Sequence, residues 1–443
     1  MQYLSKDYSA ENILTTNQKV FVVIAALWLI AAINQYGFSL LSYFISLTLL
    51  CYIFNSLFKI IVAITTKLNH KPSMPLALAS SNHPRISLLV PLFKEAKVIN
   101  SLINNLSNLN YTNFEVLLIL EEDDSETFKA LPPSLPALFK VILVPYSLPR
   151  TKPKALNYAL KETTGEIIGI FDAEDIPDKD QLLKVAQIFT NRPEIVYVQG
   201  KLRFYNKTDN LLSRFFDIEY ANIFEIFLPL ACKSGYPFPL GGTTNFVRKK
   251  HLLKHGAWDI YNVTEDADLG LRFALREEQL AYLDSTTYEE CPTRINLWLF
   301  QRARWIKGYL QTILVLLRTP LKNGFRLGAL RSLFVALTLL FSSVFYILTP
   351  YIYLLSTYLY FNNYLSPILK IIAFVSLVLG LTSLWLQAIT FEKSYRALLY
   401  PLYFFLHILA AQIAVYKLIK EPFTWDKTPH GLCKASYPKE IAN

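Results

Sequence analysis

The stretch IIGIFDAED, residues 167–175, places a short apolar run directly before three acidic side chains. An apolar run of this length is typical of a strand buried on both faces of a parallel sheet. Ligands bind at the carboxyl ends of such strands, where Asp172, Glu174 and Asp175 lie. The stretch alone leaves two interpretations open: a Mg²⁺ or Mn²⁺ site, or the N-terminal cap of a helix beginning after Pro177.

Strand and helix patterns alternate on both sides of this stretch. The alternation predicts a doubly wound, mostly parallel α/β sheet. A second acidic cluster, Glu121–Asp124, ends another predicted strand, and its aspartates are equally suited to capping residues 125–130. The predicted strands are 86–91, 114–120, 141–144, 166–171 and 195–199, and the predicted helices are 94–109, 154–161 and 181–189.

The composition indicates a membrane protein. Hydrophobic residues make up 53% of the 443 residues, and charged residues only 18%, against about 25% in soluble domains. Residues 20–58 carry no charge, and as one helix they would be nearly twice the roughly 30 Å of a bilayer core. We therefore expect two spans, about 19–34 and 38–60, and three or four more after residue 331.

These patterns divide the chain into five parts. We expect a segment with two spans (1–65), an α/β domain (66–294), amphipathic interface helices (295–330), C-terminal membrane helices (331–420) and a tail (421–443). Basic residues at the inner ends of both membrane blocks place the α/β domain in the cytoplasm, at the plasma (inner) membrane. They also explain the net charge of +10 without a nucleic-acid partner, because no aromatic–basic platform accompanies them. We expect no zinc site among the six histidines.

Residues 297–317 mix aromatic and aliphatic side chains with the sequence QRARW at 301–305. The pattern is typical of an amphipathic helix lying on the bilayer with its arginines reaching toward water. Such a helix lies where a cytoplasmic active site meets the membrane.

Taken in order, these motifs resemble those of the inverting family 2 glycosyltransferases, in particular the membrane-integrated synthases of cellulose, hyaluronan and poly-N-acetylglucosamine. The resemblance covers about residues 84–312 and implies a GT-A fold between membrane helices. The motifs are the acid Asp124 or Asp123, the DxD-like Asp172-Ala173-Glu174, Thr264-Glu265-Asp266, and Gln301 with Arg304 and Trp305. Three details depart from the family pattern: Glu174 at the third DxD position, Lys94 in place of an asparagine, and a tail that matches the cellulose synthase gating loop only loosely.

The resemblance also implies roles for residues. Asp266 would be the catalytic base, with Glu265, Gln301, Arg304 and Trp305 beside it; Asp172 and Glu174 would hold Mg²⁺ or Mn²⁺. A UDP-sugar donor would contact Glu95, Asp123, Asp124, Lys152, Lys154, Asn157 and Asp172. Gly242, Thr243, Thr244 and Trp305 would bind the acceptor, and Trp425, Lys427, Thr428 and His430 would form a gate.

We therefore expect a processive enzyme that extends a β-linked polysaccharide and exports it through its own helices. Accessory subunits could take part in this export. Two alternatives remain open at this point. One is a non-processive enzyme that adds one sugar to a lipid or other acceptor, and the other is a catalytically silent membrane scaffold. A gate would also need the tail on the cytoplasmic side. That position requires an even number of C-terminal crossings, which a break at Pro350 would supply.

Overall fold

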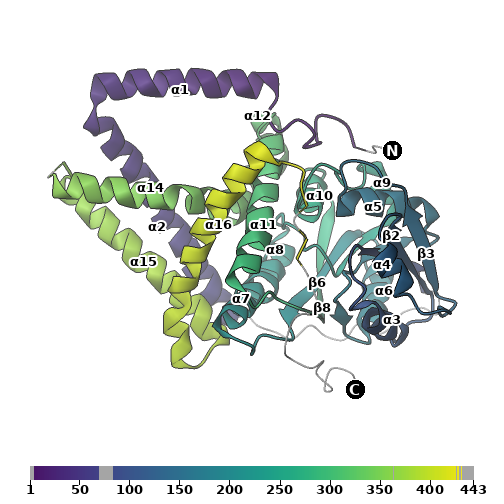
Figure 1. Ribbon diagram of the computed structural model, residues 1–443. Coiled ribbons are helices and arrows are strands. Elements are labelled where there is room, and N and C mark those ends of the chain that lie inside the picture. Colours follow the sequence, from purple (N-terminus) through teal and green to yellow (C-terminus); the bar gives the residue numbers. More distant parts are fainter. Residues whose placement is uncertain (1–3, 69–82, 363, 426, 429–430, 432–443) are drawn as a thin grey trace.

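The computed structural model describes residues 4–68, 83–362, 364–425, 427–428 and 431. An α/β domain lies at one end of the molecule and a group of long apolar helices at the other (Figure 1). Helix α11 (Ile295–Leu316) and helix α16 (Tyr400–Lys420) run side by side where the two parts meet.

One mixed eight-stranded sheet forms the centre of the α/β domain, in the order β3-β2-β1-β4-β7-β6-β8-β5. β1, β2, β3 and β4 pair in parallel, and β7 runs antiparallel to both β4 and β6. The predicted doubly wound, mostly parallel sheet is thus confirmed, with an antiparallel insertion that the sequence reading did not include. The strands are β1 (Ile86–Leu92), β2 (Phe114–Glu121), β3 (Phe139–Val144), β4 (Ile167–Ile170), β5 (Ile176–Pro177), β6 (Ile195–Phe204), β7 (Asn245–Arg248) and β8 (Gln279–Glu289).

Helices cover both faces of the sheet because the central strands are apolar on both sides. On one face, α3 (Ile99–Ser107) and α6 (Gln181–Asn191) pack onto alternate residues of β1 and β2. On the other face, the remaining alternate residues meet α5 (Lys152–Ala159), α9 (Lys249–Lys254) and α10 (Glu265–Ala274). α3 begins five residues later than predicted, because residues 93–98 form a loop in which Lys94 has a φ of +56°.

Within the described part of the chain, five helices are long and apolar enough to cross a membrane. The first two, α1 (Thr16–Tyr36) and α2 (Phe38–Leu68), meet at Gly37, whose φ is +53°. Residues Ala329–Phe361 form one continuous candidate span made of α13 (Ala329–Val335), a π-helical turn and α14 (Phe341–Phe361). The predicted break at Pro350 is therefore wrong: the proline lies inside α14, and three candidate spans follow the α/β domain, the others being α15 (Pro367–Phe391) and α16.

Helix α11 differs from the expected surface helix. It lies between α10 of the α/β domain and α16, so much of its apolar face packs against protein instead of lipid. Trp298 is fully buried, and its indole N–H donates a hydrogen bond to the hydroxyl of Tyr403 at 3.1 Å. α11 thus forms a structural link between the two parts of the molecule.

Candidate active site

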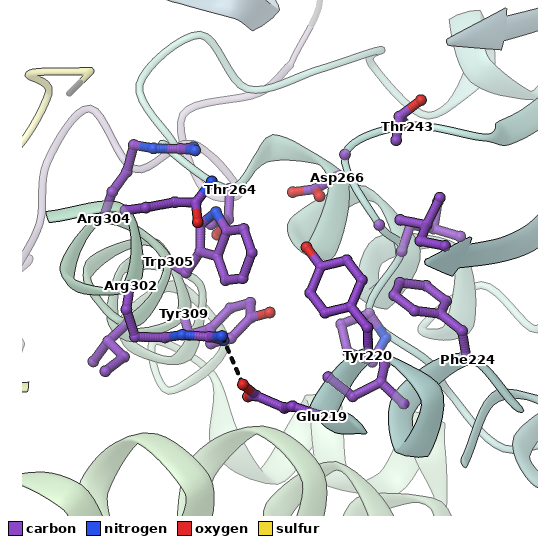
Figure 2. Close-up of a pocket in the computed structure, with 18 of the residues that line it drawn as sticks. Glu219, Tyr220, Phe224, Thr243, Thr264, Asp266, Arg302, Arg304, Trp305 and Tyr309 are labelled. Carbon is purple, nitrogen blue, oxygen red and sulfur yellow. Dashed lines mark hydrogen bonds and ion pairs between the residues drawn. The ribbon is translucent and has the colours of Figure 1, made fainter. Parts of the chain in front are cut away.

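A cavity of about 310 Å³ opens at the carboxyl ends of β1 and β4 and reaches the apolar helices. Figure 2 shows Asp266 and Thr243 on one side of it and the α11 side chains Arg304 and Trp305 on the other. The structure thereby brings together residues that the sequence spreads over more than three hundred positions. The predicted site residues that line it are Glu95, Lys152, Asp172, Glu174, Gly242, Thr243, Glu265, Asp266, Gln301, Arg304, Trp305, Trp425, Lys427 and Thr428.

The carboxylates of the turn after β4 have two different roles. Asp175 is fully buried and accepts hydrogen bonds from the Asp172 N–H at 2.7 Å and from the Thr243 hydroxyl. Burial, followed by repulsion from Asp172 and Glu174, raises the pKa of Asp175. Asp175 therefore holds the turn, and the half-buried Asp172 and Glu174 are the acids that face the cavity.

Glu289, the last residue of β8, adds a third acid to this end of the cavity. Burial raises its pKa, as do Asp175, Glu174 and Asp172, and its Oε1 has no hydrogen-bond partner among the described residues. A group of carboxylate oxygens, of which Glu289 Oε1 and Asp175 Oδ1 have no hydrogen-bond partner among the described residues, suits a hard divalent cation. The sequence reading missed Glu289 because it did not identify β8 and hence its carboxyl end.

Lys152 lies among these acids at the start of α5. Its ammonium pairs with Asp172 and donates to the carbonyl of Gly242 at 2.8 Å. Burial opposes the charge, but attraction by Asp172, Glu265 and Asp266 outweighs it and raises the pKa of Lys152. The lysine therefore stays protonated and supplies a positive charge at the cavity.

Asp266 lies in the first turn of α10, where the helix dipole favours an acid. A Cβ atom built on Gly242 would lie 3.4 Å from Asp266 Oδ2 and 4.0 Å from Asp172 Oδ2. The glycine thus leaves open the space between the predicted base and the predicted metal-binding acids. Burial raises the pKa of both Glu265 and Asp266.

Trp305 forms part of the opposite wall. Its ring stacks with that of Tyr220 at 6.0 Å between centroids, and the Arg302 guanidinium lies 4.5 Å from its centroid. Arg302 in turn pairs with Glu219 at 2.7 Å, as Figure 2 shows. Glu219 and Tyr220 were not predicted, because nothing in their local sequence distinguishes them from ordinary helix residues. Arg302 lies within the QRARW stretch, but only Gln301, Arg304 and Trp305 of that stretch were given a role.

The tail returns to this cavity. Lys307 and Gln311 of α11 donate hydrogen bonds to main-chain carbonyls of residues 421–424, between 2.9 and 3.1 Å. Beyond them, the Trp425 ring lies 6.5 Å from that of Phe93, and the Lys427 ammonium pairs with Glu95 at 2.9 Å. The predicted gate residue His430 lies outside the described residues.

Five predicted site residues do not line the cavity. Asp124 caps α4 (Ser125–Lys129) and also accepts from the Lys94 N–H. Lys154 pairs with Glu121 at 2.9 Å, and Asn157 donates to the Trp258 carbonyl at 2.7 Å. Asp123 pairs with Arg150 near the surface, and Thr244 is buried. Their binding roles stay predictions.

A histidine pair outside the cavity qualifies the expectation that there is no zinc site. His251, His255 and Glu278 have potential ligand atoms within 4.8 Å of one another. Both imidazoles hydrogen-bond the same oxygen of Glu278, at 3.0 and 2.5 Å, so the cluster is satisfied as it stands. The sequence contains the signal, since HLLKH at 251–255 is an HxxxH pair, and the expectation of no zinc site overlooked this pair.

The comparisons with known proteins identify the family of this chain. The family model described as "Glycosyl transferase family group 2" matches residues 167–416, more than half of the chain. The chain belongs to this family.

The curated relatives of this chain have names that describe different products. Beta-monoglucosyldiacylglycerol synthase of Trichormus variabilis is 31% identical over 251 residues, covering 54% of this chain and 52% of that protein. Poly-beta-1,6-N-acetyl-D-glucosamine synthase of Staphylococcus epidermidis is 25% identical over 246 residues, covering 54% and 59%. The chain thus spans about half the length of the curated relatives it matches.

Among solved structures, the mannosyltransferase PcManGT from Pyrobaculum calidifontis matches with a TM-score of 0.53 at 18% identity. The match covers 85% of this chain and 99% of that one, and it confirms the fold.

Proposed function

We propose that this protein is an inverting glycosyltransferase that extends a β-linked polysaccharide from a UDP-sugar at the cytoplasmic face of the plasma membrane. The supporting observation is a single cavity that joins Asp172, Asp266 and Trp305 and continues between the apolar helices α2, α14 and α16. A growing glycan could pass along that path from the site of transfer into the membrane helices.

The chemistry follows from the residue types. Asp266 takes the proton of the acceptor hydroxyl as its oxygen forms a bond to the anomeric carbon. The bond from that carbon to the diphosphate oxygen breaks on the opposite face, so the configuration inverts. Lys152 and Arg304 stabilise the negative charge on the departing nucleoside diphosphate.

Asp172, Glu174 and Glu289 would hold Mg²⁺ or Mn²⁺, which when bound neutralises charge on the diphosphate. The structure of PcManGT in complex with GDP-Man and Mn²⁺ supports this part of the proposal.

The test is release of the nucleoside diphosphate by the purified full chain from a panel of UDP-sugars and GDP-mannose, with Mn²⁺ or with chelator. We expect one UDP-sugar to be used, only with metal, and mass analysis to give a ladder of products. Absence of release from every donor would contradict the proposal.

The alternative is a single transfer to a lipid acceptor. It is favoured by the relatives named Beta-monoglucosyldiacylglycerol synthase. A single product mass, one sugar above a lipid acceptor, would establish this alternative in place of the polymerase.

The tail would act as a gate over the donor. Lys427 reaches Glu95 at the cavity and so lies where it can approach a diphosphate. We expect Lys427→Met to weaken UDP binding roughly three- to tenfold, as for loss of one charged hydrogen bond. Lys420→Met, at the exposed end of α16, is the control. Equal UDP affinities of the two variants, measured by titration calorimetry, would end the gating proposal.

A further inference from the structure

The two histidines and the glutamate outside the cavity form a second group of potential metal ligands. His251 lies in α9, His255 caps the C-terminus of the same helix, and Glu278 directly precedes β8. Residues four apart lie on one face of a helix, so α9 turns both imidazoles the same way. One potential ligand atom of each residue lies within 4.8 Å of the other two. Three ligands from two segments of the chain thus converge.

The atoms that face one another are the atoms that a metal ion would use. His251 Nδ1 and His255 Nε2 lie 3.0 and 2.5 Å from the same Oε1 of Glu278. Ligand atoms of a tetrahedral zinc ion lie roughly 3.3 Å apart, so each of these distances is within about 1 Å of the required value. Each neutral imidazole would offer its lone pair to the ion and keep its proton on the other ring nitrogen. The hydrogen bonds therefore hold the side chains close to a coordinating arrangement.

Contacts with α10 fix the backbone of two of the ligands. The His255 carbonyl accepts a hydrogen bond from Arg272 at 2.8 Å, and Asp268 pairs with Arg272 at 2.7 Å. The His255 ring packs edge-on against Phe273, with 5.6 Å between the centroids. The Glu278 N–H donates to the Phe273 carbonyl at 3.1 Å. Ligands that are held in place lose little conformational freedom on binding, which favours affinity.

The burial of the three side chains differs in a way that suits ion binding. The side chain of His255 is 4% exposed and that of Glu278 13%, whereas that of His251 is 28% exposed. Attraction between a cation and a carboxylate is stronger away from water. The half-buried His251 offers a path by which the ion can enter. Water would fill the fourth tetrahedral position, since three ligands come from the protein.

The ligand types indicate which metal would bind. Imidazole nitrogen with one carboxylate suits Zn²⁺, whereas Mg²⁺ and Mn²⁺ prefer oxygen ligands. The acids of the active-site cavity offer oxygen only, and none of His251, His255 and Glu278 lines that cavity. The two groups of ligands would therefore select different cations.

We propose that His251, His255 and Glu278 form a Zn²⁺ site that cross-links α9 to the segment between α10 and β8. The ion would brace the C-terminal end of α10, the helix whose first turn carries Asp266. An ion that binds only the folded chain stabilises it. This proposal does not depend on the glycosyl transfer proposed above, which diphosphate release tests separately.

His251→Ala and His83→Ala form a matched pair for the test. Each removes one histidine of the α/β domain, but His83 lies outside the group and packs against Tyr111. Glu278→Gln is a second variant, because its amide oxygen can still accept hydrogen bonds from both histidines. Full-length protein in detergent is stripped with chelator, which is then removed, and Zn²⁺ is titrated in competition with a fluorescent zinc indicator. Excess Mg²⁺ is present throughout to occupy the acids of the cavity.

We expect the parent and His83→Ala to bind Zn²⁺ with the same affinity. His251→Ala and Glu278→Gln should bind it more than about 100-fold more weakly, because changes to groups that merely support a ligand already cost roughly 10- to 100-fold. Zn²⁺ should raise the melting temperature of the parent and of His83→Ala, but not that of the other two variants. Melting temperatures without Zn²⁺ show whether each variant folds.

Three results would overturn the site. The first is a parent protein that binds no Zn²⁺, or binds it only until Mg²⁺ is added. The second is an affinity of His251→Ala or Glu278→Gln equal to that of the parent. The third is a loss in His83→Ala as large as that in His251→Ala, which would indicate unspecific binding to histidines. If one of the two ligand variants fails to fold, the other decides.

Discussion

At the scale of single residues, Asp266 carries the proposed chemistry most directly. Asp266→Asn preserves the size of the side chain but removes the base, so we expect turnover to fall by roughly 10²–10⁴. UDP affinity should be nearly unchanged, because the mutation leaves the acids after β4 intact. Asp284→Asn, exposed on β8, is the control. If the turnover of Asp266→Asn stays within about threefold of the parent, Asp266 is not the catalytic base.

The pH dependence of the rate follows from the same residue. Burial raises the pKa of Asp266 above its ordinary value, which is about 3.9. Because a general base acts in its ionised form, kcat/KM should fall as the pH decreases through this raised pKa. The acidic limb of a pH profile should therefore lie clearly above the ordinary aspartate value. A limb at or below about pH 4 would contradict a buried base.

At the scale of elements, the contact between α11 and the start of α10 positions the predicted base. A Cβ atom on Gly308 of α11 would lie 2.2 Å from Thr264 Oγ1 and 2.8 Å from Thr264 Cβ. Gly308→Ala must therefore displace Thr264, two residues before Asp266. If the start of α10 moves with it, a shift of about 1 Å in Asp266 can cost on the order of 10²-fold in rate.

Gly324→Ala on α12 (Pro320–Leu327) is the matched control for this contact. No atom lies within 4 Å of a Cβ built on Gly324, so the substitution should leave turnover unchanged and favour the helix slightly. The test compares the turnover and the melting temperature of both variants. Similar turnover in the two would show that the contact does not position the base.

At the scale of the whole molecule, the position of the tail constrains which helices cross the membrane. Three candidate spans follow the α/β domain, yet α11 bonds the main chain of residues 421–424, and Lys427 pairs with Glu95 of that domain. Figure 1 shows α14 and α15 meeting far from the α/β domain, whereas α16 lies along α11. We therefore expect α14 and α15 to cross as a hairpin and α16 to remain on the side of the α/β domain.

Cysteine labelling of sealed vesicles tests this topology. In a background without the four native cysteines, Glu421→Cys and Lys161→Cys should be labelled from one side and Asn362→Cys from the other. All three positions are exposed in the structure. Labelling of Glu421→Cys from the same side as Asn362→Cys would mean that α16 crosses, and that the tail does not reach the active site.

Local sequence predicted the elements whose signals are short-range. The central strands are apolar on both faces, and that pattern alone predicts a sheet covered twice by helices. Strand ends place Asp172 and Glu174 correctly, because the acids follow the strand directly. The charge-free runs likewise predicted both groups of candidate membrane helices, since hydropathy and length are properties of the chain alone.

Long-range packing brings some of these residues together in one cavity and leaves others outside it. Asp175 looked as suitable for metal as Glu174, but Thr243, far along the chain, holds it in the turn. Glu289 carries no local signal, because its proximity to Asp172 arises from the pairing of β8 with β6. Local sequence therefore predicts the family and most of the elements, whereas long-range packing forms the cavity and brings the tail to it.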